Sequence, residues 1–172
     1  MFSSGFGETL VWSNAHESTM TPIQNFMTSD HRYCDTFFTL TEIHVAAGHW
    51  SAAQATFVRF QALVLQHFCA EEQVLFPAFE EQTGMRTGPT QVMRSEHMQL
   101  RALMDAALAA LQAQDDDDYS GHAETLLIML QQHNTKEENV LYPMCDQLLG
   151  PQAAAVSQQL ANRIPPVSET TP

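Results

Sequence analysis

The sequence predicts an all-α protein, an antiparallel four-helix bundle of the up-down-up-down kind. Three observations favour this fold class. Four long segments carry hydrophobic residues at helical spacing, glycine or proline marks the segment ends, and no segment suggests a β-strand. The chain of 172 residues is long enough for one domain with a sizeable core. Short connections between consecutive helices make them antiparallel neighbours in a bundle.

The first two helices are expected at about residues 21–47 and 51–82. Thr21 and Pro22 can start the first helix, because threonine caps an N-terminus and proline loses nothing at the first helical position. Gly48 supplies the left-handed residue that commonly ends a helix.

The third and fourth helices are expected at about residues 89–113 and 119–149. Gly88-Pro89 restarts the chain before the third helix, and Gly150-Pro151 ends the fourth. Four consecutive acids at 115–118 precede the fourth helix, where carboxylates interact favourably with the helix dipole. The glycine-containing twelve-residue spacing of a calcium loop is absent from this stretch.

Residues 21–150 are therefore expected to form the bundle, with one segment on either side of it. Residues 1–20 resemble an arm that rests on the body through its aromatic side chains. Residues 151–172 are expected to form a mobile C-terminal tail.

The charge balance excludes several classes of function. The chain has 7 Lys+Arg against 20 Asp+Glu, a net charge of -13, so it lacks the clustered cations that bind nucleic acid or anionic membrane surfaces. No run approaches the roughly 18 apolar residues of a membrane-spanning helix. Three cysteines without a C-x-x-C pair and an N-terminus without a secretory pattern favour a cytoplasmic location. A metal remains compatible with the acidic chain.

One motif occurs twice, 66 residues apart. His67-Phe-Cys-Ala-Glu-Glu-Gln-Val-Leu-Phe-Pro returns as His133-Asn-Thr-Lys-Glu-Glu-Asn-Val-Leu-Tyr-Pro, and Asp30-His31 returns at the same offset as Glu96-His97. The repeating unit is therefore an acid-His pair followed by His-x-x-x-Glu-Glu.

The four repeated histidines should occupy one layer of the bundle. His31 and His67 lie 17 and 19 residues from Gly48, so at about 1.5 Å per residue both stand about 25 Å from that turn. His97 and His133 lie at a similar separation from the turn between the third and fourth helices, which is at the same end. Each histidine falls on an apolar stripe, which places the layer inside the bundle.

A glutamate follows each second histidine by one helical turn and shares its face. Buried carboxylates are costly without a cation, and a neutral imidazole is a metal ligand. The sequence therefore predicts a metal centre, with two ions if the glutamates bridge. Nitrogen and oxygen ligands with open positions favour iron, with manganese possible. The predicted metal ligands are His31, His67, Glu71, His97, His133 and Glu137.

This pattern resembles the hemerythrin-like, or HHE cation-binding, family over about residues 22–149, including the Leu-Phe-Pro and Leu-Tyr-Pro after each glutamate. The resemblance implies a four-helix bundle around a non-haem di-iron centre with an oxo or hydroxo bridge. It also implies the same six ligands. Dioxygen, or a related small molecule such as NO or peroxide, would be the partner.

Two positions differ from hemerythrins that carry oxygen. Those proteins have a second histidine one turn after the third-helix ligand, where this chain has Arg101. They also take an aspartate five places after the fourth-helix histidine, whereas here Glu137 stands at the fourth place and Glu138 at the fifth. Because the fifth place turns off the face, Glu137 is preferred. Four histidines rather than five favour sensing, peroxide or NO chemistry.

Several assignments stay open from sequence alone. Asp35, four residues after His31, is a metal ligand or an orienting group, or it pairs with Arg32 or Arg101. The leading function is binding, sensing or storage of a small molecule at a di-iron centre. The alternatives are a di-iron oxidoreductase or iron-sulfur centre repair protein, and a metal-free helical interaction module. The pattern does not define an oligomeric state, and whether the site turns over is not decided.

Overall fold

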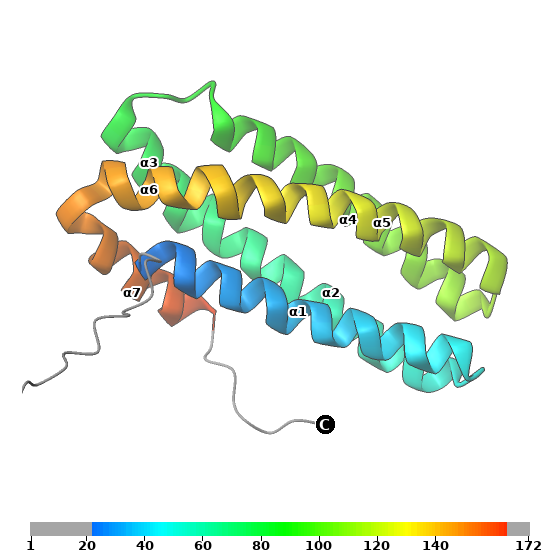
Figure 1. Ribbon diagram of the computed structural model, residues 1–172. Coiled ribbons are helices and arrows are strands. Elements are labelled where there is room, and N and C mark those ends of the chain that lie inside the picture. The colour runs from blue at the N-terminus through cyan, green and yellow to red at the C-terminus, as the bar shows by residue number, and fades with distance from the viewer. Residues whose placement is uncertain (1–21, 165–172) are drawn as a thin grey trace, which may run out of the picture.

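The computed structural model describes residues 22–164, and the N-terminal segment expected at residues 1–20 lies outside them (Figure 1). The described residues form helices and no strand, so the predicted all-α bundle is confirmed. The bundle has four long helical rods, here called arms, each made of one helix or of consecutive helical elements. The arms lie side by side (Figure 1). They are α1 (Pro22–Ala46); α2 (Trp50–Ala70), η1 (Glu71–Leu75) and α3 (Phe76–Thr83); α4 (Pro89–Ala113); and α5 (Asp116–Lys136), η2 (Glu137–Leu141) and α6 (Tyr142–Leu149).

The turns between the arms follow the predicted chemistry. Gly48 after α1 has φ +70, the left-handed conformation that glycine adopts without strain. Gln114 takes the same role after α4 with φ 56. Asp115 accepts a hydrogen bond from the Asp118 N–H at 3.1 Å and caps α5, which begins at Asp116, three residues earlier than expected. The acidic run is thus a helix start.

Two prolines coincide with short π-helical turns in the second and fourth arms. The N–H of Phe76 bonds to the carbonyl of Glu71, and the N–H of Tyr142 bonds to the carbonyl of Glu137, each five residues back. Proline has no N–H, and its ring crowds the carbonyl four residues earlier, so a wider turn beside it relieves the conflict. The arms therefore continue through Pro77 and Pro143 instead of ending there.

The core consists of two apolar clusters, one on each side of the histidine layer. One cluster is built around Phe57, Phe60 and Met104, toward the turn at Gly48. The other lies toward the opposite end of the arms and contains Phe76, Phe79 and other buried side chains. Polar residues buried between two apolar clusters are shielded from water, so the layer between them has a low dielectric constant.

The chain beyond the fourth arm differs from the expected tail. After the 3-10 turn η3 (Gly150–Gln152), residues 153–163 form α7 (Ala153–Arg163), which packs against α1 and the second arm. Val156, Leu160 and Ile164 recur every four residues and are buried, so they form one apolar face that packs against the bundle. The tail assignment is corrected for this segment, and residues 165–172 lie outside the described part.

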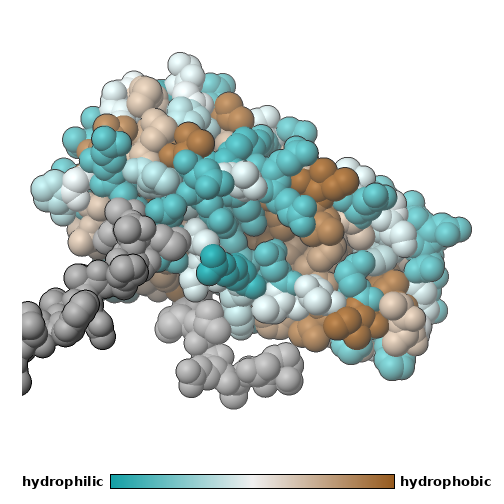
Figure 2. All heavy atoms as spheres, in the orientation of Figure 1, coloured by the Kyte–Doolittle hydropathy of each residue, from teal (hydrophilic) through white to brown (hydrophobic). Residues whose placement is uncertain are grey.

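The described surface is polar over most of the face in Figure 2, where hydrophobic side chains form separate patches. None of the helices between residues 22 and 164 combines the length and apolar character needed to cross a membrane.

Candidate metal centre

The six residues predicted as ligands meet in one buried layer. His31 comes from α1, His67 from α2, His97 from α4 and His133 from α5, while the π-turns η1 and η2 supply Glu71 and Glu137. Their exposed fractions do not exceed 5%. Their ligand atoms form two groups, each within 4.8 Å: Glu71, His97, His133 and Glu137 in the first, and His31, His67 and Glu137 in the second.

The spacing of these inner atoms suits metal ions. His97 Nε2 lies 3.3 Å from Glu71 Oε2, and His133 Nε2 lies 3.2 Å from Glu137 Oε1. In the second group, His31 Nε2 lies 3.0 Å from His67 Nε2. Two donors that each bind one ion at about 2.1 Å, at right angles, are about 3 Å apart.

Four of the inner atoms have no hydrogen-bond partner: Glu71 Oε2, Glu137 Oε1, His97 Nε2 and His133 Nε2. They approach one another, but not in hydrogen-bonding geometry. Buried polar atoms are normally satisfied, because an unpaired one costs about 1–3 kcal/mol. A cation at this point would satisfy all four, so the donor set fits a metal.

Each of the four imidazoles has a carboxylate on its outer nitrogen. The Nδ1 distances are 2.8 Å for His31 to Glu138, 2.7 Å for His67 to Asp30, 2.7 Å for His97 to Glu72 and 2.9 Å for His133 to Glu96. Such a partner fixes the ring and directs Nε2 inward, as carboxylates do for histidines that bind metals. The four partners explain the acid before His31 and His97 and the second glutamate of each repeat.

The charges in the layer compensate one another. Burial alone would lower the pKa of His31, but its hydrogen bonds to Glu137 and Glu138 raise it to about 10. Burial likewise acts to lower the pKa of His97, but Glu71 and Glu72 raise it to about 9. The hydrogen bond from His97, reinforced by Arg101, lowers the pKa of Glu72 to about 2 against the effect of burial. Without a bound cation, protons on imidazoles neutralise the carboxylates.

Arg101 closes one side of the layer. Its guanidinium forms two hydrogen bonds of 3.1 Å to the carboxylate of Glu72, which in turn holds His97. It also lies over the ring of Phe68, 5.4 Å from the centroid, and Phe68 stacks on His97 at 3.8 Å. Arg101, at the position where oxygen-carrying hemerythrins have a fifth histidine, therefore orients the carboxylate that holds His97.

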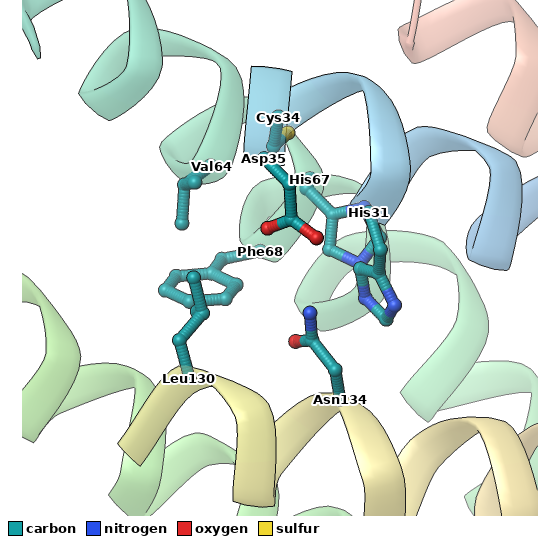
Figure 3. Close-up of a pocket in the computed structure, with 8 residues that line it drawn as sticks. All are labelled: His31, Cys34, Asp35, Val64, His67, Phe68, Leu130 and Asn134. Carbon is teal, nitrogen blue, oxygen red and sulfur yellow. The ribbon is translucent and has the colours of Figure 1, made fainter. Parts of the chain in front are cut away.

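A small pocket reaches the rings of His31 and His67, and Figure 3 shows the Asp35 carboxylate and the Asn134 amide facing one another across it. Partial burial raises the pKa of Asp35, although His31 opposes the shift. Asp35 belongs to neither group of converging ligand atoms, and Arg101 pairs with Glu72 instead.

Cys34, whose thiol lines the same pocket, is a free cysteine. Burial and the charges of Asp30 and Asp35 raise its pKa far above the usual value, so the thiol stays protonated. It is a small buried core residue rather than a nucleophile.

The residue that sequence reasoning missed is Tyr142, which was not among the predicted ligands. Its hydroxyl lies inside the layer, 2.8 Å from Glu71 Oε1, 3.0 Å from Glu137 Oε2, 3.2 Å from His67 Nε2 and 3.3 Å from His31 Nε2. Burial and the two carboxylates raise the pKa of Tyr142, so the hydroxyl donates to a carboxylate. The signal in the sequence was the aromatic residue that precedes proline in both repeats.

A helical bundle with four inward-facing imidazoles and two carboxylates in one buried layer belongs to the class of helical cation-binding proteins. The family model described as Hemerythrin HHE cation binding domain matches residues 23–145, most of the chain. The chain belongs to this family. Searches of curated proteins and of solved structures returned no significant match.

Proposed function

We propose that the chain is a non-haem di-iron protein that binds dioxygen or a related small molecule such as NO or peroxide. The four unpaired donor atoms in a buried layer carry the proposal. One ion would be held by Glu71, His97, His133 and Glu137, and the other by His31 and His67 with an oxygen of Glu137. Imidazole and carboxylate ligands suit iron, with manganese as the alternative ion. When bound, such a pair supplies redox chemistry and open positions for a small ligand.

The pocket beside His31 and His67 supports a small ligand. It is narrow, and its wall combines apolar Val64 and Leu130 with the polar ends of Asp35 and Asn134. Phe68 also lines the pocket, and Arg101 lies over the Phe68 ring and pairs with Glu72 beside His97. A diatomic molecule or peroxide would therefore approach from the Asp35 side, where the Asn134 amide can donate a hydrogen bond to it.

A second candidate function is turnover by a di-iron oxidoreductase. Asp35 favours it, because a carboxyl of raised pKa beside the pocket can hold a proton close to a small oxygen species. Repair of iron-sulfur centres has no separate support among the described residues. A metal-free interaction module would leave the buried donor atoms of the layer unpaired. Three free cysteines agree with the proposed cytoplasmic location.

Metal analysis and optical spectra of the reconstituted protein test the proposal. We expect about two iron ions per chain, bands of an oxygen-bridged iron pair, and spectral changes on adding dioxygen or NO. His67→Ala should lose bound metal, whereas His49→Ala should not, because His49 is exposed and outside the layer. A chain that binds no transition metal, with a melting temperature indifferent to chelator, overturns the proposal. Repeated consumption of peroxide or NO would identify an enzyme rather than a binding protein.

A further inference from the structure

We infer that Tyr142 is a seventh metal-binding residue, whose phenolic oxygen coordinates the ion held by His31 and His67. The inference rests on the proposed di-iron function and deepens it. It makes the two ions chemically different, since one of them binds a phenolate.

The first observation is a difference between the two groups of ligand atoms. The group around His97 and His133 has four donors, whereas the group around His31 and His67 has three. The Tyr142 oxygen lies within 3.3 Å of all three donors in the smaller group, counting Glu137 Oε2. These separations equal those between donors on one ion, so Tyr142 supplies the missing fourth atom.

The second observation is the local backbone that brings Tyr142 to the layer. In a regular α-helix, a residue five places on points about 140° away from the first. The π-turn between Glu137 and Tyr142 widens the helix, so the two side chains face the same layer and touch at 3.0 Å. Turns of this kind are frequent at functional sites. Tyr142 is completely buried, and its hydroxyl rises from the apolar cluster into the ligands.

The third observation is the matching position in the other repeat. Phe76 stands 66 residues before Tyr142, also follows a π-turn, and its ring lies 5.8 Å from His97. The Tyr142 ring lies 5.8 Å from His31. The two rings therefore occupy equivalent places, but only Tyr142 carries an oxygen. The Tyr142 hydroxyl approaches His31 and His67, as well as Glu71, whereas the Phe76 ring offers no donor atom to His97.

Coordination exchanges one bond for another without electron transfer. The O–H bond of Tyr142 breaks, an oxygen–metal bond forms, and one proton leaves to solvent. The hydrogen bond that the hydroxyl now donates to Glu71 or Glu137 is released, which frees that carboxylate oxygen for a metal.

The test is the optical and resonance Raman spectrum of the full chain loaded with ferric iron. A coordinated tyrosinate gives a phenolate-to-iron charge-transfer band in the visible region and enhanced ring vibrations. We expect both in the wild type. Tyr142→Phe should abolish both while it keeps the iron, because it preserves the ring and all six other ligands. In the Tyr142→Phe background, Phe76→Tyr should restore a shifted band from the other ion.

Outcomes separate this inference from the proposed function. If the wild type and Tyr142→Phe hold the same iron and give the same spectra, the inference fails and the di-iron function stands. A tyrosine that only donates a hydrogen bond to a bridging or bound oxygen would give this result. If the wild type takes up no iron, both fail. Circular dichroism of Tyr142→Phe checks the fold, and should the variant be unfolded, absence of the tyrosinate band from the wild type alone refutes the inference.

Discussion

Asp30→Asn tests whether the outer carboxylates support the metal centre. Asp30 accepts a hydrogen bond from His67 Nδ1 at 2.7 Å and is 7% exposed. Asparagine keeps the size and one acceptor oxygen but removes the negative charge that makes the imidazole a stronger ligand. Loss of such a partner costs about 10–100-fold in metal affinity, or about 1.4–2.8 kcal/mol. Because His67 belongs to only one group of ligand atoms, one of the two ions should be weakened.

Competition with a chromophoric chelator, titrated anaerobically with ferrous iron, measures the two affinities. The control is Asp105→Asn, the same chemical change on α4, where the exposed carboxylate contacts Gln61 and no histidine. Glu96→Gln is the counterpart in the other repeat and should weaken the ion bound through His133. Equal affinities for Asp30→Asn and Asp105→Asn would refute the supporting role. Equal weakening of both ions would refute the division into two groups.

Three further predictions concern the charges and the last helix. In the metal-free protein the pKa of His31 and of His97 is raised from 6.5 to about 10 and about 9, so their stabilising effect is complete below about pH 6.5 and is lost as the pH rises through these values. The melting temperature of the metal-free form should therefore fall over this range, and a flat profile would contradict the ion pairs. Arg101→Ala should raise the pKa of Glu72 from about 2 toward its usual value, so that metal is released at a higher pH during acid titration; Arg101→Lys should recover only part, because lysine lacks the two-pronged contact. Leu160→Ala should cost about 2–5 kcal/mol of unfolding free energy in urea titrations, because Leu160 is completely buried, and no loss would mean that α7 does not pack.

The sequence predicted the fold well because its signals are local. Helical periodicity and the residues at the turns, such as Gly48 and the acids before α5, act within a few residues. The layer was predictable for a different reason. A repeat at an offset of 66 places equivalent side chains at equal depth in an antiparallel bundle, so four histidines could be grouped without coordinates.

What the sequence did not predict depends on deviations from a regular helix. Tyr142 reaches the layer only through the π-turn, and a regular helix would have turned it away. The partners of the outer nitrogens also needed the packing between arms, because Asp30 on α1 contacts His67 on α2 rather than its neighbour His31. The helix α7 has an apolar stripe of only three or four residues, which is too short to predict a helix from periodicity.

The two repeats differ in some of the residues that surround the layer. Three pairs of positions at the same offset differ around the layer: Arg101 against Asp35, Phe68 against Asn134, and Phe76 against Tyr142. On the His97 side, Arg101 provides a cation that pairs with Glu72. Phe68 and Phe76 each place an aromatic ring near the His97 imidazole.

On the His31 side, the corresponding residues provide a carboxyl, an amide and a hydroxyl, beside a pocket that reaches the imidazoles. Repetition explains why the candidate ligands match, but not why Asn134 and Tyr142 carry polar groups where the other repeat has phenylalanine. Packing alone would favour phenylalanine over the completely buried Tyr142, since a buried polar group costs free energy unless it is satisfied. These polar side chains agree with the proposal that a small ligand binds beside His31.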